Sequence, residues 1–356
     1  MNKIYKQLIV LVLCSFSTIQ WSKADTEIFR TSQGDITRSG VVGVSFLKIP
    51  IGAQAVAMGG AYTAIANDLT SMFWNPAGLA SIEGYQANIS YSQWFGGFSH
   101  NFASGVVSLG NYRVGLGLIS FGANDIPFTT IEDPTGSGRT YSVSDVCLVA
   151  SFAGKITNEF SFGANFKYIN SAFSSVSSNG IAFDIGTKYE SDWKGLRLGF
   201  VLSNLGPAQN YAGQDLNQVK SLVNGLSAAP VDYALISSQY QLPLTFRAGM
   251  GVDMLSVVNN TDNTPQDSDH KWTLAADFFT MADSKEQGAI GTEYVWNNLL
   301  ALRAGYQIGH DTFGFSGGIG LNYTSGLFDG KIDYAISPAN AQIGLINRIS
   351  IGIALK

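Results

Sequence analysis

The segment EFSFGANFKYI, residues 159–169, alternates between two kinds of side chain. Every second position from Phe160 to Tyr168 is aromatic or apolar, and the positions between them, from Ser161 to Lys167, are small or polar. Successive side chains of a β-strand point to opposite faces. The alternation therefore predicts a strand with an apolar environment on one side and a polar environment on the other.

The same alternation recurs from residue 86 onward, in short stretches that turn residues separate. We expect fourteen such strands, and the even number would let the first and last strands pair antiparallel and close the sheet. The expected strands are residues 86–94, 99–109, 112–122, 143–153, 158–170, 179–190, 195–204, 243–254, 270–280, 287–296, 299–309, 312–324, 329–337 and 346–356.

Two architectures accommodate such strands. A soluble sandwich points its apolar face inward, whereas a membrane barrel points its apolar face to lipid and its polar face into the lumen. Here 13% of the 356 residues are charged, about half of the roughly 25% typical of a soluble domain. The polar faces are rich in Gly, Ser, Ala and Asn, where a water-facing surface would carry more Lys and Glu. The sequence therefore favours an all-β fold, a 14-stranded antiparallel transmembrane β-barrel.

Single charges are scattered over the polar faces of these strands. Inside a barrel they would point into the lumen, where we expect them to form a hydrogen-bonded ladder that anchors an inner segment. A role in ion selectivity is the alternative. The predicted lumen-facing charges are Lys167, Asp184, Arg197, Arg247, Asp277, Glu293 and Arg303.

The N-terminus has the features of a signal peptide: a basic start, an apolar core at 8–16 that is too short to span a bilayer, and small residues before a cut after Ala24. A lipoprotein anchor at Cys14 is the alternative, but Cys14 lies inside the apolar core. Removal of 1–24 would shift the net charge from −5 to −8, which argues against nucleic-acid binding. We expect export to the outer membrane of a Gram-negative-type bacterium.

Residues 44–82 do not alternate and are dense in Ala and Gly. We expect Asp68 to cap a short helix that runs through Phe73, and Pro76 to end that helix. Small residues allow close backbone packing, so we predict that this segment folds into the lumen as a plug. An N-terminal extension at 25–43 would precede the plug, and the barrel would occupy 83–356.

The stretch FLKIPIGAQAVAMGGAYTAIANDLTSMFWNPAGLA closely resembles the N-terminal signature of the PorV/PorQ family, itself similar to the FadL-type outer-membrane transporters. The shared elements are GAQAVAMGGAYTA at 52–64, an Asn-Asp pair at 67–68 and WNPAGLA at 74–80. FadL-type barrels also have fourteen strands. The expected plug motif consists of Gly52, Met58, Gly59, Gly60, Asn67, Asp68, Trp74, Asn75, Pro76 and Gly78.

This resemblance implies two functions. PorV-like members are carriers in type IX secretion, which receive the C-terminal domain of a secreted cargo protein and pass it to an attachment complex. We expect this role first, because the long connections at 123–142 and 205–242 would face outward. FadL-like members take up hydrophobic small molecules through a plugged barrel, which is the alternative. The expected partners are thus outer-membrane lipid with cargo and attachment proteins, or a hydrophobic ligand.

Motifs for catalysis and metal binding are weak. GFSGG at 314–318 matches the nucleophile pattern G-x-S-x-G, but Ser316 would lie within a strand and not at a strand-to-helix elbow. The histidines form no recognisable triad pattern, and Cys147, the single cysteine after residue 24, gives no metal-ligand spacing. We therefore expect no enzyme activity, no metal and no cofactor, and a monomer that joins larger assemblies.

Overall fold

The computed structural model describes residues 42–131, 133–136, 138–220, 231–262, 268–339 and 343–355. All of them belong to the second of two compact units, Arg38–Lys356. The predicted signal peptide, its cleavage site and nearly all of the expected extension at 25–43 lie outside the described residues. These parts of the prediction therefore stay predictions.

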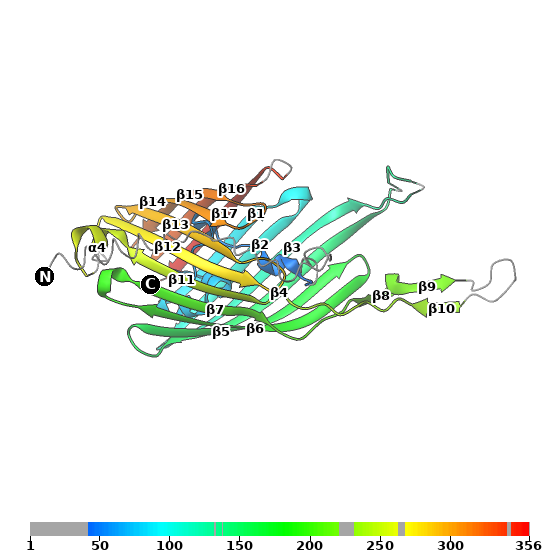
Figure 1. Ribbon diagram of the computed structural model, residues 1–356, viewed down its shortest axis with the longest axis horizontal. Coiled ribbons are helices and arrows are strands. Elements are labelled where there is room, and N and C mark those ends of the chain that lie inside the picture. The colour runs from blue at the N-terminus through cyan, green and yellow to red at the C-terminus, as the bar shows by residue number, and fades with distance from the viewer. Residues whose placement is uncertain are drawn as a thin grey trace, which may run out of the picture. The chain divides into compact units, whose positions relative to one another are not determined.

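Fourteen long strands form one closed antiparallel barrel, which confirms the predicted fold class and strand number (Figure 1). Consecutive strands pair with one another, β7 pairs with β11, and the first strand pairs with the last, which closes the ring. The barrel strands are β1 (Tyr85–Gln93), β2 (Ser99–Leu109), β3 (Tyr112–Pro127), β4 (Thr140–Lys155), β5 (Phe160–Phe173), β6 (Val176–Glu190), β7 (Arg197–Leu205), β11 (Thr245–Asp253), β12 (His270–Met281), β13 (Gln287–Trp296), β14 (Leu300–Ile308), β15 (Phe315–Thr324), β16 (Phe328–Pro338) and β17 (Leu345–Leu355).

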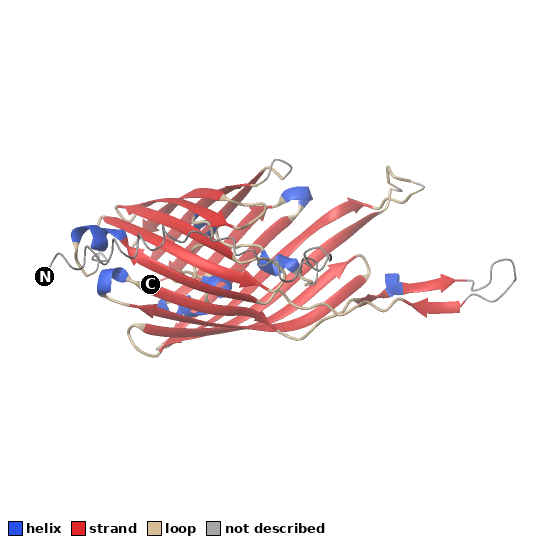
Figure 2. Ribbon diagram, in the orientation of Figure 1, coloured by secondary structure: helices blue, strands red, loops and turns tan. Residues whose placement is uncertain are grey.

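The connection between β7 and β11 carries three short strands. β8 (Ala212–Gly213) pairs with β6, and β9 (Asn217–Lys220) pairs with β10 (Val231–Ala234) as a separate hairpin. The same connection contains the short helix η6 (Gln214–Leu216), and short helices occupy other connections, as Figure 2 shows: η4 (Phe95–Gly97), η5 (Trp193–Gly195) and α4 (Met254–Asn259).

No helix in the described ranges is long and apolar enough to cross a membrane.

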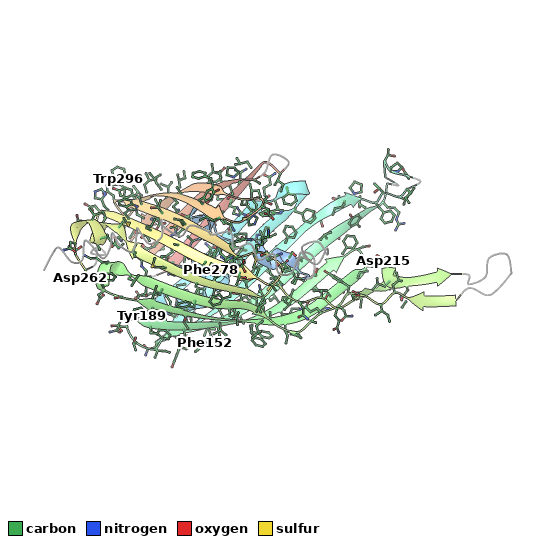
Figure 3. The ribbon with its side chains drawn as sticks, viewed as in Figure 1. Phe152, Tyr189, Asp215, Asp262, Phe278 and Trp296 are labelled. Atoms are coloured by element: carbon green, nitrogen blue, oxygen red, sulfur yellow. The ribbon has the colours of Figure 1, made fainter. Side chains whose placement is uncertain are left out.

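The barrel exposes its apolar side chains and buries its polar ones. In β3, Leu116 is 70% exposed, whereas Arg113, on the other face of the same strand, is 9% exposed. Aromatic side chains behave in the same way: Phe152, Phe278 and Trp296 are exposed and point away from the ribbon (Figure 3). Water would disfavour such a surface, and hydrocarbon would not. The outward face of the strands is therefore suited to lipid.

A segment at 44–82, which we call the inner segment, lies inside the ring of strands. Its helix α2 (Ala53–Ala57) packs against β14 to β17, and its 3₁₀ helix η3 (Pro76–Ser81) packs against β4, β5 and β6. The strand faces that make these contacts are the buried faces of the barrel wall. Within the inner segment only Ser45 and Asn67 are exposed. The segment also contains η2 (Ser45–Lys48) and α3 (Ser71–Trp74). That it stops solutes, as a plug would, stays a prediction.

Glycines on the inward faces allow the backbone of the inner segment to approach the wall closely. A Cβ atom on Gly163 would lie 2.2 Å from the carbonyl carbon of Pro76, and one on Gly305 would lie 2.0 Å from that of Met58. Neither distance is possible between non-bonded carbon atoms, so a larger residue would displace the backbone. The scattered Gly of the polar faces thus has a packing role at these positions.

Two local expectations are wrong. The connection expected at 123–142 is shorter, because β3 continues through a bulge to Pro127 and β4 begins at Thr140. Asp68 does not cap the helix: its Oδ1 accepts from the N–H of Thr70 at 3.0 Å, and α3 begins only at Ser71. The connection after β11 begins with the short helix α4, which Asp253 caps at its N-terminus.

Candidate functional site

Asn75 of the plug motif ties the inner segment to itself and to the wall. Its Nδ2 donates to the carbonyl oxygens of Thr63 and Thr187, both at 3.0 Å. Its Oδ1 accepts from the N–H of Ala77 at 3.1 Å, so that Asn75 also caps η3, with Pro76 as the first residue of that helix. A buried amide is stable only when its polar atoms find partners, and both of these do.

Charged side chains on the wall bind backbone groups of the inner segment. Oδ2 of Asp277 accepts from the N–H groups of Tyr62 and Thr63 at 3.1 and 2.9 Å. Nζ of Lys188 donates to the carbonyl oxygen of Ala66 at 3.0 Å. Asp277 belongs to the predicted lumen-facing charges. Lys188 does not, although it lies on the same polar face of β6 as the predicted Asp184.

Lys167 and Asp184 form a buried ion pair, with 2.7 Å between Nζ and Oδ2. The side-chain oxygen of Asn204 accepts from Lys167 at 2.9 Å, and the N–H of Asn204 donates to Asp184 at 2.8 Å. Nδ2 of Asn165 bridges from Asp184 to the carbonyl oxygen of Met72, at 2.7 Å in each case. This cluster therefore links three wall strands to the inner segment.

Arg303 sits between two carboxylates. Its Nη1 lies 2.6 Å from Oδ1 of Asp333, and its Nε donates to Oε2 of Glu293. Gln54 of α2 donates to Glu293 at 2.9 Å and accepts from Lys331. Two of the predicted lumen-facing charges, Arg303 and Glu293, are thus brought together. Asp333 and Lys331 complete the network.

The two remaining predicted charges lie apart from these clusters. Arg197 is half-buried, and its Nε donates to the carbonyl oxygen of Gly195 at 3.3 Å. The guanidinium of Arg247 lies over the rings of Trp74 and Phe279, 5.0 and 4.2 Å from their centroids. Such cation–π contacts stabilise a guanidinium without cancelling its charge. Within the described residues neither arginine makes an ion pair.

Two cavities in the lumen are lined by residues that the structure describes. One of about 40 Å³, which we call the arginine cavity, is lined by Arg247 and Arg348 together with Trp74, Phe279 and Phe313. A second of about 370 Å³, the polar cavity, is lined by Gln54, Asn67, Asp68, Asn88, Asn322, Asp329, Lys331 and Asp333 among others. The inner segment contributes to both, since Gln54 faces the polar cavity and Val56 faces the arginine cavity.

Arg348, like Lys188, Lys331 and Asp333, is a lumenal charge outside the predicted set. It is 2% exposed, its Nη1 donates to Oγ of Ser337 at 3.3 Å, and its guanidinium lies 5.5 Å from the ring centroid of Trp94. The available signal was its place on the polar face of the last strand, where it alternates with Ile349 and Ile351. Nothing in the sequence pairs it with Arg247, 101 positions earlier, because the cavity joins β11 to β17.

Most of the plug motif has a backbone role. Gly52, Gly59 and Gly60 adopt φ angles of 82°, 68° and 83°, which favour glycine. A Cβ on Gly78 would lie 2.4 Å from the carbonyl oxygen of Ala66. Met58 packs against the wall glycines, Trp74 donates its indole N–H to the carbonyl oxygen of Ile51 at 2.9 Å, and Asn67 is exposed.

Ser316 lies within β15, away from any strand-to-helix elbow, and donates to the carbonyl oxygen of Ala57 at 3.3 Å. Of the histidines, His100 is buried on β2, whereas His270 contacts Tyr294 and His310 caps its own turn. The described residues contain no group of three His, Cys, Asp or Glu side chains arranged to hold a metal ion.

Comparison with known proteins shows a shared fold. No family model matches the sequence. A UPF0164 protein of Treponema pallidum (strain Nichols) is 26% identical over 168 residues, which cover 44% of this chain and 42% of that protein. The match therefore spans less than half of the curated relative.

Solved structures of transport barrels cover most of the chain. The CymD monoaromatic hydrocarbon channel is similar with a TM-score of 0.56 and 14% identity, over 85% of this chain and 96% of that chain. The P. putida toluene transporter TodX is similar with a TM-score of 0.56 and 14% identity, over 85% of this chain and 97% of that chain. A Pseudomonas aeruginosa FadL homologue is similar with a TM-score of 0.53 and 12% identity, over 86% of this chain and 98% of that chain. The chain thus has the fold of FadL-like barrels, and its resemblance to PorV/PorQ stays a prediction.

Proposed function

We propose that this protein is an outer-membrane channel for the uptake of hydrophobic small molecules. The observation that carries the proposal is an aromatic-lined cavity inside a barrel whose outer face is apolar. Ligand sites combine apolar and aromatic walls with a few polar groups, and the arginine cavity has this composition. The FadL-like fold supports the same proposal, since the similar barrels are named as hydrocarbon and toluene transporters.

Passage through the lumen would require the inner segment to move. Helix α2 borders both cavities, with Gln54 on one and Val56 on the other. Ala57, at the end of α2, faces Gly318 of the wall, where an added Cβ would lie 2.7 Å from the Cβ of Ala57. A disulfide places two Cβ atoms about 3.5–4.5 Å apart, so one would form only if α2 moved slightly away from the wall and the new side chain cleared the carbonyl oxygen of Tyr334, at 2.5 Å from the added Cβ.

The double variant Ala57→Cys, Gly318→Cys therefore tests the proposal. Intact Gram-negative cells that lack other channels of this kind would be assayed for uptake of radiolabelled toluene, with and without the wild-type protein. We expect the wild type to raise the uptake rate, the oxidised double variant to lose the gain, and a reductant to restore it. Equal uptake by cells with and without the wild-type protein would contradict the proposal.

The cargo-carrier role in type IX secretion is a second proposal. Leu235 and Ile236, in the connection before β11, are 51% and 95% exposed, which suits contact with a protein partner. An affinity tag in the connection at 205–242 would be used to purify the barrel from crosslinked outer membranes. Recovery of secreted proteins that share a C-terminal domain would support this role, and recovery of the barrel alone would count against it.

A further inference from the structure

The arginine cavity is too small, as it stands, for the ligands that the proposed function requires. Its volume of about 40 Å³ holds roughly three water-sized probes, at about 10–15 Å³ for each. A single aromatic ring is larger than this. The structure therefore corresponds to a closed form of the cavity, and entry of an aromatic ligand requires part of the lining to move.

Most of the lining is held in place by the barrel. Its strand residues, such as Arg348, lie in strands that are paired on both sides. Its inner-segment residues, such as Trp74, belong to the segment that packs against the wall. Among the described lining residues, only Phe313 and Gly314 lie outside the barrel strands and the inner segment. Both belong to the turn between β14 and β15, residues 309–314, which we call the lid.

The lid is a compact turn with a glycine at each end. Gly309 has a φ of 78°, which favours glycine. Gly314 accepts from the N–H of Gln307 at 2.8 Å, which ties the base of the lid to β14. Between them, Nδ1 of His310 accepts from the N–H groups two and three residues later, at 3.0 and 3.1 Å. The turn can therefore move as a unit, with the backbone rotation taken up at its ends.

A tryptophan from another hairpin holds the lid over the cavity. Trp94 lies in the turn between β1 and β2, and its ring centroid is 5.9 Å from that of Phe313, at 53° between the planes. The guanidinium of Arg348 on β17 lies 5.5 Å from the Trp94 ring and connects it to the wall. Trp94 is not among the described residues that line the cavity. Its loss would therefore release Phe313 without enlarging the cavity.

We propose that residues 309–314 form a lid that closes the arginine cavity, with Trp94 as its latch, and that separation of Trp94 from Phe313 admits an apolar ligand. The proposal rests on the proposed function, because it names the entry step of that channel. The lid lies at the end of the barrel that carries the connection between β7 and β11, the longest of the barrel. Outer-membrane barrels carry their longer connections on the outer side, so the lid would open to the outside of the cell.

Access of a small thiol reagent to a cysteine inside the cavity tests the proposal. Val56 lines the cavity and is 6% exposed, so Val56→Cys in a Cys147→Ala background reports entry. The full chain in detergent would be treated with methyl methanethiosulfonate, and mass spectrometry would follow the rate of labelling. We expect Trp94→Ala to raise this rate about 2- to 10-fold, which is the weight of one aromatic pair, and Trp94→Phe to restore the slow rate.

Trp272→Ala is the matched control. Trp272 is also a partly exposed tryptophan, but it lies on the outer face of β12, where its indole N–H donates to Oγ1 of Thr292. Its loss should leave the labelling rate unchanged. The heat-sensitive mobility of the barrel in electrophoresis would confirm that each variant is folded. Labelling of folded Trp94→Ala at the same rate as the parent and the Trp272→Ala control would overturn the inference.

The toluene uptake assay separates the lid from the proposed function. Faster labelling of Trp94→Ala without toluene uptake by the wild type would support the lid and refute the hydrocarbon channel. Toluene uptake by the wild type with unchanged labelling of Trp94→Ala would refute the lid alone.

Discussion

Replacing Gly163 by alanine should push the inner segment away from the wall. The added Cβ would lie 2.2 Å from the carbonyl carbon of Pro76 and 2.4 Å from the nitrogen of Ala77. Both are backbone atoms of η3, so no side chain can rotate to make room. The opposite residue on β6 is also a glycine, Gly186, where a Cβ would meet Oδ1 of Asn75 at 2.1 Å.

The magnitude follows from these contacts. Overpacking in a closely packed interior costs about 1–3 kcal/mol. A shift of η3 would also weaken the hydrogen bonds of Asn75, each worth about 1 kcal/mol. Alanine in place of glycine restricts the unfolded chain and returns about 0.4–1 kcal/mol. We therefore expect Gly163→Ala to lower the free energy of unfolding by about 1–3 kcal/mol.

Urea unfolding in phospholipid vesicles, followed by tryptophan fluorescence, would measure this change. Gly352→Ala is the matched control, because Gly352 also lies on an inward face but a Cβ there would meet its nearest atom, Nδ2 of Asn88, at 3.6 Å. The control should be neutral or slightly stabilising. If Gly163→Ala unfolds at the same urea concentration as Gly352→Ala, η3 does not pack against β5 and the placement of the inner segment is wrong.

Three further predictions follow from the lumenal contacts. Arg303→Met should lower the free energy of unfolding by about 3–5 kcal/mol, because it leaves two buried carboxylates without their cation. Lys331→Met, at the partly exposed edge of the same network, should lower it by less than about 1 kcal/mol. Urea unfolding would compare the two variants. Asn75→Ala should cost about 1–3 kcal/mol in the same assay, since it leaves buried backbone groups unsatisfied, and a loss below about 0.5 kcal/mol, half of the low end, would contradict its anchoring role. Cys147 is fully buried in a cluster formed by wall and inner-segment side chains, so a maleimide should label it in the mature chain only after unfolding, and rapid labelling of the folded barrel would show that the inner segment leaves the lumen.

The barrel could be predicted from the sequence because its signal is local. Alternation along a single stretch such as 159–169 fixes which side chains share a face, and this requires no knowledge of the partner strands. The expected strand at 112–122 ended too early for the same reason. Asn124 and Asp125 interrupt the alternation, and Asp125 adopts a φ of 56°, but the ladder continues beyond the bulge to Pro127.

The inner segment shows where a local signal is ambiguous. Asp68 precedes a short helix, and its sequence position suits an N-cap, but its carboxylate instead accepts from Thr70 in a tight turn. Asn75, which sequence reasoning placed in the motif only as part of a resemblance, is the residue that caps a helix. Both can cap helices, and their contacts with the rest of the barrel determine which one does.

The sequence by itself determined the class of fold, the number of strands and the faces on which the charges lie, because a period of two depends only on the order of residues in a strand. Only the tertiary structure decided that Arg303 finds two carboxylates, while Arg247 and Arg348 form no ion pair within the described residues. The barrel brings strands that are distant in sequence around one lumen. The inner segment forms hydrogen bonds with some of their polar side chains there. The energy of a buried charge depends on those neighbours and not on its own position in the chain.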